Sequence, residues 1–122
     1  MIKRSIEDTS IVFIGAGNLA TNLAHAFYRK GFRVVQIYSR TEDSARTLAQ
    51  AVEADYTTSL ASVVPDAQLY IVLLKDDALV ELLPQIVAGK GKGLWVHTAG
   101  SIPMDIWKGH VERYGVFYPL QT

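Results

Sequence analysis

Short apolar runs alternate along the chain with longer stretches in which apolar residues recur every three or four positions. Runs such as residues 11–14 (Ile-Val-Phe-Ile) are typical of strands that are buried on both faces of a parallel sheet. Stretches such as residues 18–30, with Leu19, Leu23 and Phe27, are typical of helices that bury one face. The pattern predicts strands at residues 11–14, 33–38, 56–58, 69–74, 94–97 and 116–118. It predicts helices at residues 18–30, 41–52, 59–64 and 76–87, and a single helical turn at 103–107.

The alternation of strands and helices predicts an α/β fold, a doubly wound parallel sheet with right-handed crossovers. The expected strand order is 3-2-1-4-5-6, and sheets of this kind bind ligands outside the carboxyl ends of their strands. Glycines and polar residues follow several predicted strands and therefore share that edge: Gly15 and Gly17, Ser39 and Arg40, Lys75 and Asp76, His97 and Thr98, and Tyr118. The sequence therefore predicts a ligand site at this edge.

The first predicted strand runs directly into Gly15-Ala16-Gly17-Asn18-Leu19-Ala20, which opens a helix. Gly15 suits a tight turn, Gly17 leaves the backbone open to a pyrophosphate, and the small Ala20 lets helix and strand pack closely. The helix N-terminus adds unpaired N–H groups and a partial positive charge. We interpret residues 15–20 as the phosphate loop of a dinucleotide site. The alternative is a glycine turn that binds nothing.

A second glycine-rich stretch, residues 89–93 (Gly-Lys-Gly-Lys-Gly), follows a helix rather than a strand. We interpret it as a loose connection and not as a second phosphate loop.

The end of the second predicted strand indicates which dinucleotide binds. Proteins that bind NAD usually carry Asp or Glu there, because a carboxylate accepts hydrogen bonds from both ribose hydroxyls. Here Ser39, Arg40 and Thr41 follow the strand, and no acid occurs before Glu42. Two hydroxyls, a guanidinium and the start of a helix suit a 2′-phosphate. The sequence therefore predicts NADP(H) in preference to NAD(H). The alternative is a helix capped by Thr41 beside a solvated arginine.

Further candidates follow the fourth and fifth predicted strands. We expect Leu74, Lys75 and Thr98 to contact the cofactor, with a solvated lysine as the alternative for Lys75. His97 is a candidate catalytic residue, because a neutral imidazole beside the nicotinamide can donate a hydrogen bond or carry a proton. Ser101, with Thr98, is a candidate for holding a substrate carboxylate. The alternatives are a strand-end histidine bonded to backbone and hydroxyls that cap the loop.

Other conspicuous residues have simpler interpretations. Asp76 or Asp77 is expected to cap a helix rather than to act as an acid or base. Trp95 and Trp107 are expected in the core or at a contact with another domain. His25 and His110 have no clustered partner, so no metal site is predicted. Tyr118 and Gln121 either face the substrate or pack against a further domain.

Length and composition narrow the classes of protein to which this chain can belong. The chain has 122 residues, of which 49% are hydrophobic, which suits a single domain with one core. Twelve Lys and Arg residues balance twelve Asp and Glu residues, and no basic run occurs, which argues against nucleic acid as a partner. The absence of cysteine excludes disulfide and thiolate chemistry. No apolar run reaches the length of a membrane span and no signal peptide is evident, so we expect a cytoplasmic protein.

The motifs together resemble a known group of proteins. Residues 15–20 and Tyr38-Ser39-Arg40-Thr41 resemble the NADP-binding domains of the 6-phosphogluconate dehydrogenase-like superfamily. That superfamily includes pyrroline-5-carboxylate reductase and the coenzyme F420-dependent NADP reductases. Residues 97–101 (His-Thr-Ala-Gly-Ser) and 118–122 (Tyr-Pro-Leu-Gln-Thr) are similar to one branch, the Rossmann-like proteins with a C-terminal domain of unknown function (DUF2520).

The resemblance implies a Rossmann fold that binds NADP and a helical second domain that dimerises and completes the active site. It makes residues 1–122 the dinucleotide-binding domain, with the second domain absent from this chain, and the full-length protein a homodimer. We expect this chain to bind cofactor without turning over substrate. Trp95, Trp107 and strand 116–118 are then expected to be exposed, or buried by self-association.

The leading functional hypothesis is the NADP-binding domain of an oxidoreductase that acts on a small molecule. The sequence does not name that substrate. A non-catalytic dinucleotide-binding or sensing module is the alternative. A methyltransferase is a third hypothesis, but it usually needs an acid after the second strand, which Ser39 and Arg40 match poorly.

Overall fold

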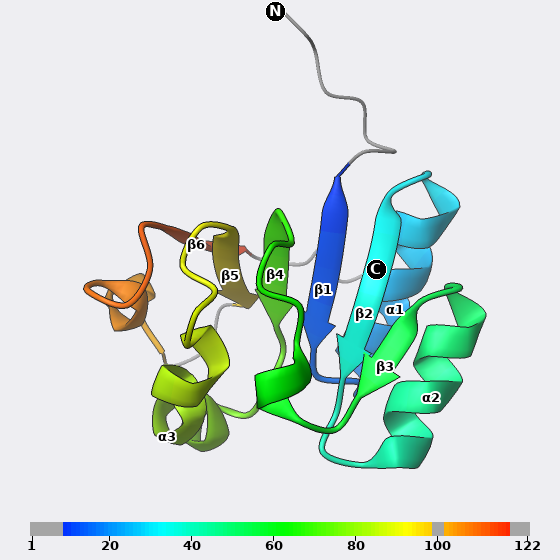
Figure 1. Cartoon of the computed structure of the whole chain (residues 1–122), viewed down its shortest axis with the longest axis horizontal. Helices are drawn as coiled ribbons and strands as arrows, with labels where there is room; N and C mark the ends of the chain where they lie inside the picture. The colour runs from blue at the N-terminus through cyan, green and yellow to red at the C-terminus, as the bar shows by residue number, and fades with distance from the viewer. Residues whose placement is uncertain (1–8, 99–101, 118–122) are drawn as a thin grey trace, which may run out of the picture.

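The computed structural model describes residues 9–98 and 102–117, which form one parallel sheet with helices on both faces (Figure 1). Its six strands lie in the order β3-β2-β1-β4-β5-β6, which confirms the predicted fold class. The strands are β1 (Ser10–Ile14), β2 (Arg33–Tyr38), β3 (Asp55–Thr57), β4 (Leu69–Val72), β5 (Leu94–Thr98) and β6 (Arg113–Phe117). The α-helices are α1 (Asn18–Arg29), α2 (Glu42–Ala51) and α3 (Asp76–Val87), and two 3-10 turns are η2 (Leu60–Ser62) and η3 (Met104–Trp107).

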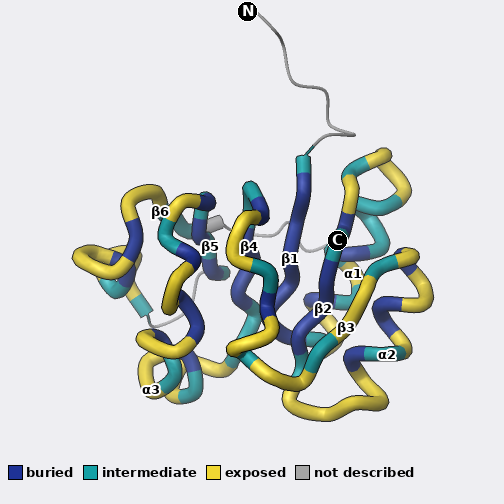
Figure 2. Tube along the Cα trace, viewed as in Figure 1, coloured by how far each residue is buried: buried dark blue, intermediate teal, exposed yellow. Residues whose placement is uncertain are grey.

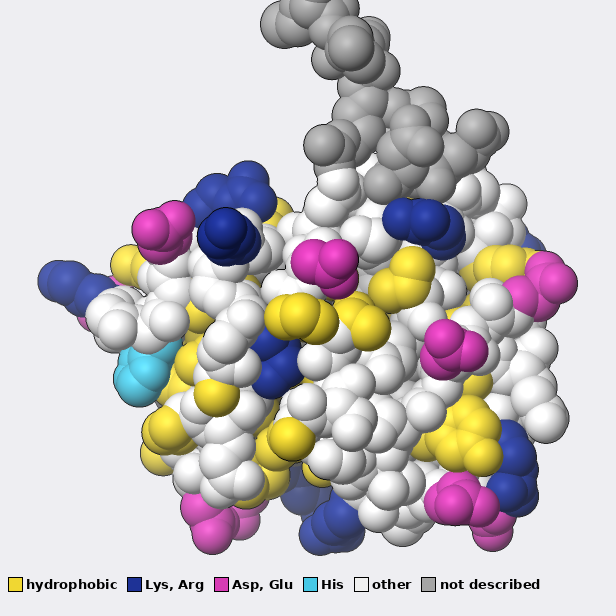
Figure 3. Space-filling view, in the orientation of Figure 1, with side chains coloured by type: hydrophobic (Ala, Val, Ile, Leu, Met, Phe, Trp, Pro, Cys, Tyr) yellow, Lys and Arg dark blue, Asp and Glu magenta, His cyan; other side chains and the backbone are white. Residues whose placement is uncertain are grey.

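The sheet separates two layers of packed side chains. Ile11 and Phe13 of β1 pack with α1 and α2 on one face, whereas Val12 and Ile14 pack with α3 and η3 on the other. Alternate residues of a strand point to opposite faces, so β1 contributes to both cores. In Figure 2 the central strands of the sheet are accordingly coloured as buried. On the face drawn in Figure 3, acidic and basic side chains of the described residues are interspersed.

The strand register aligns the carboxyl ends of the strands. Ile14 pairs with Tyr38 on one side and with Val72 on the other, and Val72 pairs with His97. Neighbouring strands lie about 4.8 Å apart, so these four residues form one row across the sheet. The residues that come next in each strand or loop, Ser39, Gly15, Leu73 and Thr98, therefore begin the edge at which the sequence predicts a ligand site.

Several predicted boundaries shift in the structure. β4 ends two residues early because the chain turns away after the Leu73 N–H bonds to the Ile14 carbonyl (2.8 Å), and α3 begins at Asp76. β6 begins at Arg113 rather than at residue 116, since this edge strand starts with an exposed Arg113 instead of an apolar run. The helix predicted at residues 59–64 is only the three-residue turn η2. Residue 118 lies outside the described residues.

A buried aromatic cluster fixes the half of the sheet formed by β4 and β5. Tyr70 stacks on Trp95 with ring centroids 4.1 Å apart, and Trp107 of η3 lies 5.8 Å from Trp95. Both tryptophans are fully buried within this chain. The expectation that they are exposed, or buried only by self-association, is therefore wrong, because α3 and η3 already cover this face.

The connection between α3 and β5 is anchored, in contrast to the loose loop that its glycines suggest. The backbone carbonyl of Lys90 accepts the Trp95 indole N–H (2.9 Å), and the buried Lys90 amine donates to the Ala88 carbonyl (3.1 Å). Burial lowers the pKa of the Lys90 amine below its usual value. A side chain at Gly93 would lie 2.7 Å from the Ala67 carbonyl oxygen, so this glycine is required by close packing.

A buried glutamine holds the segment between β3 and β4 against the sheet. The Gln36 amide donates to the Ser62 carbonyl (3.1 Å) and accepts from the Val64 N–H (2.8 Å). Gln36 is only 6% exposed, so an apolar replacement leaves both backbone groups without their partner.

We predict that Gln36→Leu lowers the free energy of unfolding by about 2–4 kcal/mol, because two backbone groups lose hydrogen bonds. Urea unfolding measures this change. Gln50→Leu, on the exposed surface of α2, is the matched control and should stay within about 0.5 kcal/mol of wild type. Equal stabilities for the two variants would show that the Gln36 contacts contribute nothing.

Candidate functional site

Gly15 is the residue at which β1 leaves the sheet. Its φ of +124° lies in a region that favours glycine, and an added Cβ would lie 2.6 Å from the carbonyl oxygen of Leu73. Its N–H donates to the Tyr38 carbonyl (2.7 Å). The turn therefore passes too close to the loop after β4 to accept any side chain. Gly15 is required by the fold itself, whether or not a ligand binds.

Gly17 occupies the N-cap position of α1 under different constraints. Its φ of −77° is accessible to any residue, and an added Cβ would meet no protein atom within 4 Å. Gly17, Asn18 and Leu19 are exposed, and the first turn of α1 carries neither an acidic residue nor a side-chain cap. The N–H groups and positive end of α1 are thus left for an external anion, as a phosphate loop requires.

The two alanines of the loop have packing roles. Ala20 is 1% exposed and belongs to the core between the sheet and the helices α1 and α2. Ala16 packs against the edge of the same core. The predicted close packing of helix and strand at Ala20 is confirmed, so Ala20 supports the loop from below.

The segment after β2 leaves its polar groups accessible. Arg40 is exposed and makes no hydrogen bond or ion pair with the described part of the chain. Thr41 stands at the N-cap of α2, but its hydroxyl does not cap the helix, so that prediction is wrong. Instead, the Ser39 hydroxyl accepts the Thr41 N–H (3.3 Å), which stabilises the turn locally. Arg40 and Thr41 are thus both exposed and adjacent in sequence at the start of α2.

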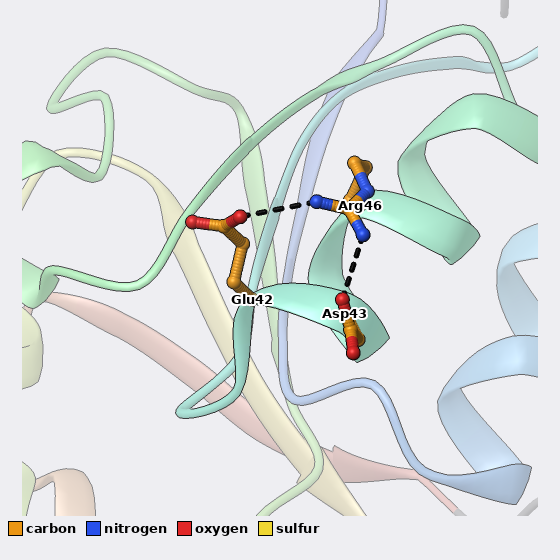
Figure 4. A network of polar contacts seen from close by, with 3 residues as sticks. All are labelled: Glu42, Asp43 and Arg46. Atoms are coloured by element: carbon orange, nitrogen blue, oxygen red, sulfur yellow. Dashed lines mark hydrogen bonds and ion pairs between the residues drawn. The ribbon is translucent and has the colours of Figure 1, made fainter.

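The first carboxylates after β2, those of Glu42 and Asp43, form ion pairs with Arg46 within α2 (Figure 4). Arg46 donates from one guanidinium nitrogen to Glu42 (3.0 Å) and from the other to Asp43 (2.6 Å). The two acids that follow Thr41 are consequently neutralised by a residue one turn further along the helix.

The loop after β4 differs in detail from expectation. Lys75, not Asp76 or Asp77, occupies the N-cap position of α3, and its side chain is exposed. Asp77 lies in the first turn and accepts the Ala78 N–H (2.9 Å). Leu74 is half-buried against the core that contains Trp95. Lys75 and Leu74 lie at the predicted edge, and so does the half-buried Thr98, which pairs with Phe117.

His97 is held by protein groups on both sides of its ring. The Trp107 indole N–H donates to His97 Nδ1 (2.9 Å), and His97 Nε2 lies 3.0 Å from the Ile102 carbonyl oxygen. An indole N–H can only donate and a carbonyl can only accept, so Nδ1 carries no proton and Nε2 carries one. His97 is 2% exposed. This geometry favours the strand-end interpretation over proton transfer, because neither nitrogen is directed to a ligand.

Some predicted positions lie outside the described residues, namely Ser101, Tyr118 and Gln121. Within the described ranges, no group of three His, Cys, Asp or Glu residues is placed to hold a metal ion. No helix in the described part of the chain is long and apolar enough to cross a bilayer.

The family model described as coenzyme F420-dependent NADP oxidoreductase matches residues 10–96. This chain belongs to that family. The match confirms the resemblance to F420-dependent NADP reductases and makes the chain an NADP oxidoreductase-like dinucleotide-binding domain.

Solved structures agree with the family assignment. A candidate NADP oxidoreductase from Bacteroides fragilis is 72% identical and superposes with a TM-score of 0.93; the match covers 97% of this chain but only 46% of that protein. An imine reductase from Myxococcus stipitatus in complex with NADP+ is 20% identical, with a TM-score of 0.71 over 86% of this chain and 39% of its own. Prephenate dehydrogenase from A. aeolicus, in complex with NAD+ and hydroxyphenyl propionate, is 16% identical, with a TM-score of 0.79 over 96% of this chain and 43% of its own.

The last two likenesses show the fold alone, given their low identity. No functionally curated protein matches the chain.

Alanine substitutions at Gly15 and Gly17 should change the free energy of unfolding by different amounts. Gly15→Ala should lower the free energy of unfolding by at least about 2 kcal/mol, because it adds backbone strain and a contact with the Leu73 carbonyl. Gly17→Ala should lower it by about 1 kcal/mol or less, since its Cβ meets no protein atom and only the weaker N-cap preference of alanine is felt. Thermal and urea unfolding of both variants measure the contrast. Equal losses at the two positions would contradict the separate roles assigned to them.

Proposed function

We propose that this chain is the NADP(H)-binding domain of an oxidoreductase and prefers NADP(H) to NAD(H). The observation that carries the proposal is the end of β2, where Arg40, which has no hydrogen-bond or ion-pair partner among the described residues, stands beside Ser39 and Thr41. A guanidinium forms bidentate, charge-assisted hydrogen bonds with a phosphate, and it can also stack on adenine. The pairing of Glu42 and Asp43 with Arg46 removes a source of repulsion.

The diphosphate of the cofactor then occupies the open space beside Gly17, at the N-terminus of α1. Backbone N–H groups of the loop and the helix dipole stabilise its negative charge. The bound cofactor supplies hydride transfer, and the protein orients it along the carboxyl edge of the sheet. Leu74, Lys75 and Thr98 line that edge and contact the rest of the cofactor.

Substrate binding belongs, in this proposal, to the remainder of a longer protein. The chain spans less than half of the B. fragilis relative, so the whole protein's activity rests on more than these residues. The resemblance at residues 97–101 and 118–122 supports a helical second domain of the DUF2520 type and homodimerisation. A cytoplasmic location and a small-molecule substrate complete the proposal. The isolated chain then binds cofactor without turnover.

One observation favours a second candidate, a non-catalytic dinucleotide-binding module. The candidate catalytic His97 has both nitrogens occupied by Trp107 and Ile102. Hydride transfer by the full-length protein in the presence of a reducible imine or keto acid distinguishes the two candidates. Cofactor binding without any turnover by the full-length protein would favour the module.

The test of cofactor choice is Arg40→Ala. This substitution should weaken the binding of NADPH by about ten- to a hundredfold and leave the binding of NADH nearly unchanged. The reason is that a charge-assisted contact with the 2′-phosphate contributes about 1.5–3 kcal/mol. Isothermal titration with both cofactors, for wild type and variant, gives the four dissociation constants.

Arg33→Ala is the matched control, because Arg33 is an exposed arginine at the opposite end of β2. It should leave both constants unchanged. Equal losses of NADPH and NADH in Arg40→Ala, or a wild-type preference for NADH, would contradict the proposal.

A further inference from the structure

We infer that Arg46 is a positioning residue for cofactor choice, which acts by neutralising Glu42 and Asp43 so that a 2′-phosphate can bind beside Arg40. The inference rests on the proposed function, since it concerns the same end of the site. It adds a residue that does not itself touch the cofactor and that lies a full helical turn beyond the Ser39-Arg40-Thr41 segment.

The helix geometry places Arg46 over the first turn of α2. Side chains of a helix tilt toward its N-terminus, so residues three and four positions apart meet on one face. Arg46 reaches both Asp43, three residues back, and Glu42, four residues back, with separate nitrogens of one guanidinium (Figure 4). One side chain thus engages both acids nearest to the N-cap Thr41.

The charges of this segment balance only when Arg46 is counted. Arg40 and Arg46 contribute two positive charges, and Glu42 and Asp43 contribute two negative charges, so residues 39–46 are neutral in sum. Without Arg46 the sum is one negative charge. A phosphate monoester carries about −1.5 to −2 near neutral pH, and exposed charges interact over a Debye length of about 8 Å at physiological ionic strength. Uncompensated acids in the first turn of α2 therefore oppose a 2′-phosphate, whereas the hydroxyl of NADH at that place is insensitive to them.

Tyr56 of the neighbouring strand β3 also affects the charge state of this guanidinium. A hydrogen bond with the Tyr56 side chain of β3 raises the pKa of Arg46, and the nearby Asp43 raises it further. Arg46 therefore remains a cation under all conditions in which the cofactor binds.

The stability of α2 should depend little on these ion pairs. Arg46 is 40% exposed, Glu42 64% and Asp43 89%, and exposed ion pairs at this spacing contribute little to stability. Loss of Arg46 should consequently shift the melting temperature slightly but change the ratio of the dissociation constants for NADPH and NADH. A purely structural role would change both constants together.

The decisive experiment compares Arg46→Gln with wild type by titration with NADPH and NADH at low ionic strength. We expect NADPH to bind about three- to tenfold more weakly and NADH to change by less than about twofold. Arg46→Lys keeps the positive charge and should retain most of the preference. Adding Glu42→Gln and Asp43→Asn to Arg46→Gln should restore the preference for NADPH, because the two negative charges that oppose the 2′-phosphate are then removed. Raising the salt concentration should reduce the difference between wild type and Arg46→Gln.

Several results would overturn the inference. The first is an unchanged ratio of the NADPH and NADH dissociation constants in Arg46→Gln. The second is equal weakening of the binding of both cofactors. The third is failure of the Glu42 and Asp43 replacements to restore the preference for NADPH. A wild-type protein without preference for NADPH would instead refute the proposed function. Circular dichroism and melting temperatures confirm that each variant is folded before its affinities are compared.

Discussion

The close approach of the Gly15 turn to the loop after β4 is the constraint on which the rest of the site depends. The turn leaves 2.6 Å between the position of a Cβ on Gly15 and the Leu73 carbonyl oxygen, and its N–H bonds to the end of β2. Three strands are thereby held together at the point where the sheet order reverses. The start of α1 follows directly from this point, so the direction of its N–H groups is set by backbone packing.

The two halves of the sheet are stabilised differently. The half with β1, β2 and β3 packs against α1 and α2 through small and aliphatic side chains, and it carries the proposed phosphate and ribose contacts. The half with β4 and β5 is built on Tyr70, Trp95 and Trp107, with His97 bonded to the last of these. This buried aromatic layer supports the carboxyl edge of the sheet, and both nitrogens of His97 are bonded to protein groups beneath it.

The predictable features of this protein are those with a period or a fixed spacing. The parallel strands, their order and the glycine turn that leads into α1 follow from apolar runs and from two glycines between a strand and a helix. The pairing of His97 with Trp107 has no such signal, since ten residues and a turn separate them. Likewise, Glu42 and Asp43 suit the first turn of any helix. Their spacing from Arg46 permits ion pairs, and the side-chain geometry shows that one guanidinium engages both. The glycines of residues 89–93 suggest a loose connection between α3 and β5. In the structure this connection is held by the Lys90 backbone carbonyl, which accepts the Trp95 indole N–H, and by the buried Lys90 side chain, and the sequence marks neither.

The central claim is that the dinucleotide lies on the carboxyl edge of the sheet, from the N-terminus of α1 to the end of β2. Titration of the ¹⁵N-labelled chain with NADPH, followed by amide chemical shifts, tests this most directly. We predict the largest shifts at Gly15, Gly17 and Leu19 and at Ser39 to Thr41. Shifts centred on the opposite edge, at the hollow lined by Gly91, Lys92 and Val111, would contradict it.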